Sequence, residues 1–159
     1  MSDAELSNLA QRARAAHTRV AAEHAAQQTA DLCAEFYKLL SDISGEELPK
    51  AVLKIAREFG ADPAPILAAL NPGQPIIVRR DQAPGGFGLD NLDACYQQAC
   101  EAAGGEWVDD ATIRGCKARQ GVTAAEWAAS LLAYHINAME CLARAGGGVL
   151  GKIWDIITD

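Results

Sequence analysis

Three histidines and five cysteines are the side chains of this 159-residue chain best suited to nucleophilic, acid–base or metal chemistry. His17 and His24 are seven residues apart, so on one helix they share a face but lie two turns apart, too far to bind one metal ion together. His135 lies in an apolar helical pattern and is predicted to be a core histidine with its hydrogen bonds satisfied. Since no HExxH, ExxH or paired-carboxylate pattern occurs, we expect no metal and no other cofactor.

The cysteines contain no CxxC pair, which argues against a zinc site or a thioredoxin-type redox pair. Cys100 and Cys116, which flank a Gly-Gly pair and Trp107, could close a hairpin through a disulfide, as in small secreted modules. Because the N-terminal segment lacks the apolar core of a secretory signal, reduced and buried thiols are the preferred interpretation. Cys95 lies in acidic surroundings that would raise the pKa of a thiol, so we predict that the chain is not an enzyme. The five cysteines are Cys33, Cys95, Cys100, Cys116 and Cys141.

Carboxylates are concentrated in one part of the chain. The net charge is −7, and residues 81–113 hold seven acids with no lysine or arginine, whereas the remainder balances 14 acids with 14 bases. An unbalanced negative surface attracts basic protein surfaces and repels nucleic acid. The seven acids are Asp81, Asp90, Asp93, Glu101, Glu106, Asp109 and Asp110.

This charge pattern predicts a non-enzymatic acidic binding protein, a small regulator or inhibitor that docks on a basic surface of a larger protein, with a nucleic-acid-binding surface as one candidate. Trp107 would serve as an aromatic anchor within the negative surface. A face that only keeps an alanine-rich protein soluble is the alternative interpretation of the same charges. As a class, the chain is similar to the compact acidic inhibitors of phages and mobile elements, including anti-CRISPR proteins. The predicted partner-binding residues are Asp90, Asp93, Glu101, Glu106, Trp107, Asp109 and Asp110.

Residues 55–71 resemble the helix-turn-helix signature of bacterial repressors. Ala56 matches the small residue where the two helices touch, Gly60 the turn and Ile66 the buried anchor of the second helix. The resemblance implies an alternative function, a DNA-binding transcription regulator that uses residues 49–71. Its recognition helix carries no Arg, Lys, Gln or Asn for reading base edges, so nucleic acid is not the expected partner. The early residues of that helix are Asp62, Pro63, Ala64, Pro65, Leu67 and Ala68.

The elements that would position these residues are mainly helices. Residues 2–40 contain neither glycine nor proline and predict one long helix, bent near residues 23–28. Large apolar side chains are few in its first half, which favours packing on a partner or on a second copy. Thr123 and Glu126 form a capping box at the start of a later helix. Further helices are expected over 49–59, 63–70, 89–103 and 123–144, an apolar piece over 149–157, an extended segment over 75–80 and a hairpin pairing 106–109 with 111–114.

Together these patterns predict a mainly α fold. We expect a single compact bundle of five or six helices with a long N-terminal helix and at most a minor β-hairpin. The whole chain, 1–159, is predicted to form one domain, with its weakest seam at 72–88. No apolar run approaches the roughly 20 residues that span a bilayer, so we expect a cytoplasmic protein without membrane contact. Its sequence leaves a homodimer open. A third function left open is an exported effector with the Cys100–Cys116 disulfide.

Overall fold

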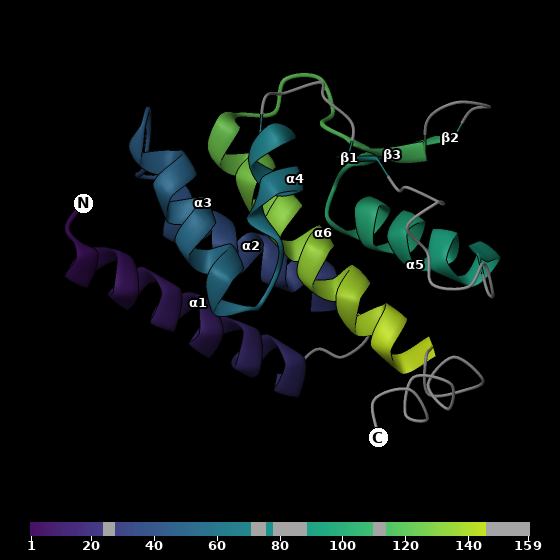
Figure 1. The fold of residues 1–159 in the computed structure, drawn as a ribbon, viewed down its shortest axis with the longest axis horizontal. Helices are drawn as coiled ribbons and strands as arrows, with labels where there is room; N and C mark the ends of the chain where they lie inside the picture. Colours follow the sequence, from purple (N-terminus) through teal and green to yellow (C-terminus); the bar gives the residue numbers. More distant parts are fainter. Residues whose placement is uncertain (24–27, 71–75, 78–88, 110–113, 146–159) are drawn as a thin grey trace.

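The computed structural model describes residues 1–23, 28–70, 76–77, 89–109 and 114–145, in which six helices and a small antiparallel sheet are present (Figure 1). The prediction of a mainly α bundle with a minor β-hairpin is confirmed. The helices are α1 (Asp3–Glu23), α2 (Gln28–Leu40), α3 (Glu47–Glu58), α4 (Pro63–Ala68), α5 (Leu89–Ala102) and α6 (Ala124–Ala145), and the strands are β1 (Ile76–Ile77), β2 (Glu106–Asp109) and β3 (Arg114–Lys117).

Helix α6 is the element around which the others pack, and it contacts α2, α3, α4 and α5. Trp127, Leu131 and Tyr134 on this helix are each at most 1% exposed. The helix begins at the predicted capping box, where Thr123 Oγ1 accepts from the Glu126 backbone N–H at 3.2 Å and the Glu126 carboxylate accepts from the Thr123 N–H at 3.4 Å. Within the described ranges, neither α6 nor any other helix is long and apolar enough to cross a membrane.

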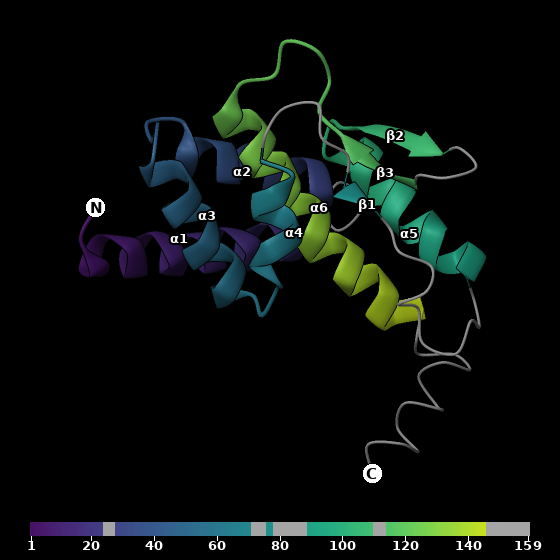
Figure 2. The ribbon, with the colours of Figure 1, turned by 45° about the horizontal axis from the view of Figure 1, so that its top comes forward.

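The first two helices take the place of the single long helix that the sequence predicts. α1 ends at residue 23, α2 begins at residue 28, and α2 runs back beside α1 (Figures 1 and 2). Leu32, Phe36 and Leu40 of α2 are fully buried in the core. A continuous helix would carry these three side chains away from the core, and burying each large apolar side chain is worth about 1.5–3 kcal/mol. Burial of these side chains therefore favours two packed helices over one long helix.

The apolar face of α1 is covered by the chain itself. Leu9, Ala13 and Val20 are each at most 4% exposed, and α1 contacts both α2 and α3. Small alanine side chains allow helices to approach closely, so a helix with few large residues still packs well against its neighbours. The first half of α1 has few large apolar side chains, but its buried face is covered by α2 and α3 without a partner or a second copy.

The small sheet has the strand order β1–β3–β2, with both pairs antiparallel. β1 lies in the predicted extended segment 75–80, and β2 has the predicted bounds 106–109. The second hairpin strand was expected at 111–114, but β3 occupies 114–117 and leaves a longer connection after β2. The observed register places Trp107 opposite Cys116, which brings Cys116 over the end of α5. The correction follows from this contact between strand and helix, which local turn signals do not report.

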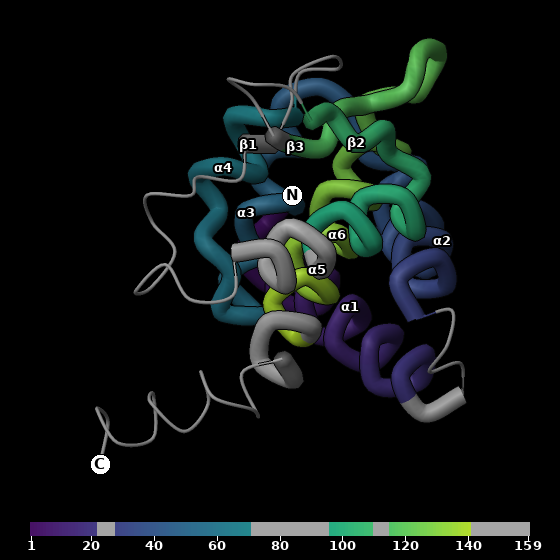
Figure 3. Tube along the Cα trace, turned by 90° about the vertical axis from the view of Figure 1, so that its right-hand side faces the viewer, coloured from purple at the N-terminus to yellow at the C-terminus, as the bar shows by residue number. Residues whose placement is uncertain are grey.

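The two ends of the molecule are built from different helices and strands (Figures 1 and 3). α5 and the sheet lie at one end, and α3 with the beginning of α1 lies at the other, with α6 between them. One continuous hydrophobic core links both ends and draws side chains from all six helices. Of the predicted weak seam at 72–88, only residues 76–77 belong to the described part of the chain, and the apolar piece at 149–157 lies outside it.

Candidate functional site

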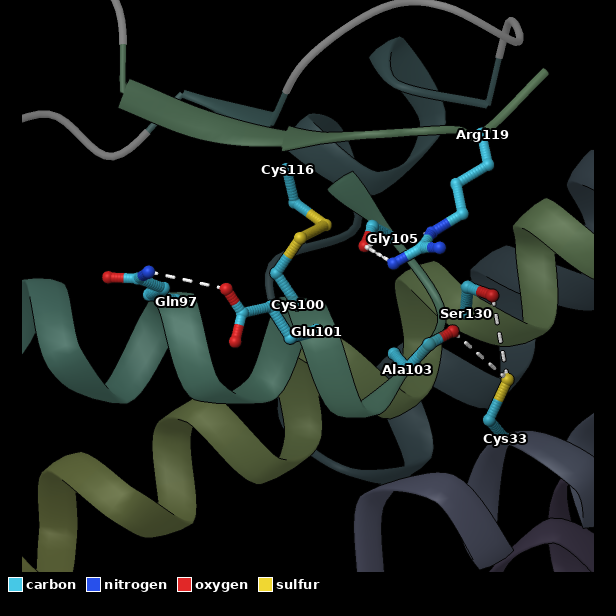
Figure 4. Close-up of a disulfide and its surroundings, with 9 residues drawn as sticks. All are labelled: Cys33, Gln97, Cys100, Glu101, Ala103, Gly105, Cys116, Arg119 and Ser130. Atoms are coloured by element: carbon cyan, nitrogen blue, oxygen red, sulfur yellow. Dashed lines mark hydrogen bonds between the residues drawn. A yellow bond between two sulfur atoms is a disulfide. The ribbon is translucent and has the colours of Figure 1, made fainter. Parts of the chain in front are cut away.

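The end of α5 and the strands β2 and β3 form what we call the acidic corner (residues 96–109 and 114–119), shown in Figure 4. A disulfide joins Cys100 of α5 to Cys116 of β3, with a sulfur–sulfur distance of 2.05 Å and a Cα–Cα distance of 5.6 Å. Both cysteines are buried in the core. The preferred interpretation of reduced thiols is therefore wrong for this pair, because the fold brings the two side chains to bonding distance although 16 positions separate them.

Two glycines shape the turn under this disulfide. Gly104 has φ +84°, and its N–H donates to Glu101 O while the Gly105 N–H donates to Cys100 O, the pattern that ends a helix with a left-handed residue. A Cβ on Gly105 would lie 2.4 Å from Cys116 Sγ and 2.9 Å from Cys100 Sγ, so only glycine fits there. The Gly105 carbonyl accepts from the Arg119 guanidinium at 3.3–3.4 Å. The backbone from α5 into β2 is thus held from both sides.

Three predicted partner-binding acids have described side chains, and all three are exposed at this corner. Glu101 lies on the last turn of α5, where its Oε1 accepts from Gln97 Nε2 at 3.2 Å. Glu106 and Asp109 are the first and last residues of β2. The side chains of Asp90 and Asp93 on α5, and the whole of Asp110, lie outside the described residues.

Strand pairing sets two basic positions of β3 across from two acids of β2, whose charge the sequence predicts to be uncompensated. In the register of β2 and β3, Glu106 lies opposite Lys117 and Asp109 lies opposite Arg114. Opposite charges directly across an antiparallel pair stabilise it by roughly 0.2–1 kcal/mol. The expectation of fully uncompensated charge is therefore wrong for the hairpin. These two cations, Arg114 and Lys117, follow directly after the acidic segment 81–113. Only the strand register shows that they lie opposite Asp109 and Glu106.

Trp107, the predicted anchor, is half-buried and packs against the core. Tyr96 on α5 is also half-buried, its ring centroid lies 5.8 Å from that of Tyr134 on α6, and burial raises its pKa. Both aromatic side chains therefore combine a packed portion with a portion open to solvent. On β2, Trp107 shares a face with Asp109, whereas Glu106 lies on the other face, because successive strand residues alternate. An aromatic side chain held in this way can contact a partner without losing much conformational freedom.

The structure also brings together a histidine–carboxylate pair that the sequence analysis missed. His17 Nε2 of α1 lies 2.6 Å from Glu140 Oε1 of α6, and the second carboxylate oxygen accepts from Gln28 Nε2 of α2 at 2.9 Å. The His17 side chain is only 14% exposed, and its ring packs edge-on against Phe59. No sequence signal could have found this pair, because 123 residues separate its members. These contacts link three helices, α1, α2 and α6.

The remaining candidate catalytic groups lie in surroundings that do not activate them. Cys33, a free thiol, lies 3.5 Å from Ser130 Oγ and 3.6 Å from Ala103 O, and burial raises its pKa, which disfavours the nucleophilic thiolate (Figure 4). Burial lowers the pKa of His135 to about 4, and among the described residues its Nε2 has no hydrogen-bond partner. The prediction of a satisfied core histidine is thus wrong in its hydrogen bonding. No described group of three or more His, Cys, Asp or Glu residues is placed to hold a metal ion.

The helix-turn-helix resemblance matches α3 and α4 as a packing pattern. Ala56 and Ile66 are fully buried, and Gly60 has φ +69° at the turn. On α4 the exposed side chains are those of Ala64, Pro65 and Ala68, which offer no donor or acceptor to a base edge. At the start of α4, Asp62 caps the helix and accepts from the Ala64 N–H at 3.1 Å. A DNA reader built on this pair would have to use side chains from elsewhere.

Comparison of the chain with known protein families, with curated proteins and with solved structures gave no match. Its function therefore has to be argued from the acidic corner and the other groups described above.

Proposed function

We propose that the chain is a non-enzymatic binding protein, a small regulator or inhibitor, whose acidic corner docks on a basic surface of a larger protein. The observation that carries the proposal is the exposure of Glu101, Glu106 and Asp109 on a backbone segment that also bears the half-buried Trp107 and is held by the Cys100–Cys116 disulfide. A preorganised surface loses little conformational entropy on binding. Carboxylates at its rim speed the encounter with a positive partner and make it sensitive to salt.

The cross-strand cations limit what this surface can bind. The acidic corner holds three bases, Arg114, Lys117 and Arg119, which equal its three acids in number, so recognition by charge alone would be weak there. Trp107 and the end of α5 then have to supply the contact area, which is where aromatic anchors contribute most to affinity. We therefore expect a partner with a basic rim around an apolar pocket, rather than a purely basic chain.

The disulfide favours a variant of this proposal over a cytoplasmic regulator. Disulfides form and persist in oxidising compartments and are rare where cells keep thiols reduced. Cys100 and Cys116 support the exported form of the binding protein, the alternative that the sequence analysis left open. Peptide mapping of protein taken from its native host into an alkylating agent tests this directly. Recovery of both cysteines as alkylated thiols would contradict the exported form and indicate that the protein resides in a reducing compartment.

Charge reversal tests the docking surface. The variant Glu101→Lys, Glu106→Lys, Asp109→Lys should lose at least tenfold in capture of native-host proteins at low salt, because the encounter would become repulsive. Its matched control is Asp42→Lys, Glu46→Lys, Glu58→Lys, which changes the same number of exposed charges away from the corner. Capture followed by mass spectrometry at low and high salt is the measurement. If both variants retain the same partners as the unmodified chain, the acidic corner serves only solubility.

A further inference from the structure

Residues of α1 and α3 line a groove. These two helices lie side by side at the end of the molecule opposite α5 and the sheet (Figures 1 and 2). The groove has a volume of about 450 Å³. The lining combines three cations of α3 with one leucine from each helix and a single acid at the beginning of α1. These residues are Lys50, Lys54, Arg57, Leu6, Leu53 and Asp3.

The three cations share one face of α3, because positions four and seven residues apart lie above one another on a helix. Lys50 is 58% exposed and lies 3.7 Å from Glu47, whereas Lys54 and Arg57 form no ion pair with any described residue. Elsewhere on the described surface Arg19 and Lys38 both pair with Glu35, whereas Arg12 and Lys117 also form no ion pair with a described residue. The groove thus holds two neighbouring cations that the fold does not pair.

The apolar part of the lining decides what class of anion fits. Leu6 and Leu53 are half-buried and lie among the cations. A phosphate backbone offers no apolar group to these leucines. A peptide can place carboxylates on the cations and an apolar side chain on the leucines at the same time. Acidic peptides are therefore favoured over nucleic acids.

The ends of the groove are held by contacts between α1 and α3. The Met1 amino group lies 2.8 Å from Glu47 Oε2, and Arg14 Nη2 donates to Glu58 O at 3.3 Å. The Arg14 guanidinium also lies 4.6 Å from the centre of the Phe59 ring. Because contacts at both ends fix the two helices side by side, the groove exists before any peptide arrives, which lowers the cost of binding.

We propose that the groove between α1 and α3 binds an acidic peptide segment of a partner protein, with carboxylates on Lys50, Lys54 and Arg57 and an apolar side chain between Leu6 and Leu53. This site is separate from the acidic corner and does not depend on the function proposed for it. A protein with both surfaces would join a basic partner at one end to an acidic segment at the other.

The test uses a fluorescein-labelled peptide of the sequence EELLEELLEE and measures its fluorescence anisotropy on titration with the full chain. The variant Lys50→Glu, Lys54→Glu, Arg57→Glu should bind this peptide at least tenfold more weakly. The milder variant Lys50→Gln, Lys54→Gln, Arg57→Gln should also weaken binding and keeps the test valid if the first fails to fold, which circular dichroism will show. A control that reverses Arg12, Arg19 and Lys38 to glutamate should bind within about twofold of the unmodified chain, because these cations lie outside the groove.

Two further probes separate the proposal from simple charge attraction. The peptide EESSEESSEE carries the same charge without leucines and should bind at least fivefold more weakly. A labelled DNA duplex should bind no more tightly than this serine peptide. Equal binding of the two peptides, a preference for DNA, or no loss of binding in either groove variant would each overturn the proposal. Reversal of Glu101, Glu106 and Asp109 should leave peptide binding intact, so failure of one proposed surface is distinguishable from failure of the other.

Discussion

The acidic corner and the groove between α1 and α3 are held in shape by different means. At the corner a covalent bond, Cys100–Cys116, fixes a four-residue strand against the end of α5, and the fit requires glycine at position 105. At the groove no covalent link is present among the described residues, and α1 and α3 are held by packing and by contacts at both ends.

The two regions need different support because they bury different amounts of apolar surface. A strand of four residues with half-exposed Trp107 and Val108 buries too little apolar surface to hold itself in place, and small β units need additional support. Helices of 21 and 12 residues bury long apolar faces and can hold a surface by packing alone. Covalent support is therefore found at the region that lacks a core of its own.

Removal of a core aromatic near the groove should have the largest effect on stability. Phe36 is fully buried on α2 and packs edge-on against Phe59 at the end of α3, with ring centroids 6.0 Å apart. Phe36→Ala should lower the free energy of unfolding by about 3–5 kcal/mol, because it removes buried area and leaves a cavity. Urea denaturation followed by circular dichroism is the measurement. The loss should be the same with and without a reducing agent, and a loss under about 1 kcal/mol would contradict packing as the means of support at this end.

Removal of the disulfide should have the next largest effect, and it should depend on redox conditions. Cys100→Ser with Cys116→Ser should lower the free energy of unfolding by about 3 kcal/mol, because a closed loop of this length restricts the unfolded chain by that amount. The unmodified chain in a reducing agent should behave like the double variant. Hydrogen exchange should increase first in β2 and β3, while α1 and α3 keep their protection. Uniform loss of protection across the chain would remove the distinction between the two ends.

A smaller loss of folding stability is expected at acidic pH, because His135 in the core is held neutral. Burial lowers the pKa of His135 to about 4, although the Asp62 carboxylate acts in the opposite direction. In the unfolded chain the imidazole takes up its proton near its ordinary pKa of about 6.5, so below that pH the unfolded state binds more protons and the fold loses stability. Between about pH 7.5 and about pH 5 the loss from this group should be about 2 kcal/mol.

The matched variant for this prediction is His135→Gln, which cannot titrate. Its free energy of unfolding should fall less steeply between the same two pH values than that of the unmodified chain, by about the amount given above. Urea denaturation at both values measures the difference. Identical slopes for the two proteins would show that His135 is accessible to protons in the folded state.

Much of the helical structure could be predicted from local patterns. The capping box of Thr123 and Glu126 predicts the beginning of α6. Gly60 and Gly104, both with positive φ, follow the ends of helices. Ala13 of α1 and Ala99 of α5 are buried, at 0% and 5% exposure, on helices that the sequence predicts. The end of α1 could be predicted only as a bend, because whether a helix turns back depends on the burial gained by Phe36 and its neighbours in the folded chain.

Sequence by itself determined which side chains are available: the carboxylates on residues 81–113, the cations of α3 and the helical periodicity of the apolar residues. The tertiary structure decided which of them meet. It joined Cys100 to Cys116, set Lys117 opposite Glu106, and placed His17 beside Glu140 across 123 residues. Propensity and capping act over a few residues and can be read along the chain. A disulfide, a strand register or an ion pair depends on distances in space, which only the packing of the helices around α6 sets.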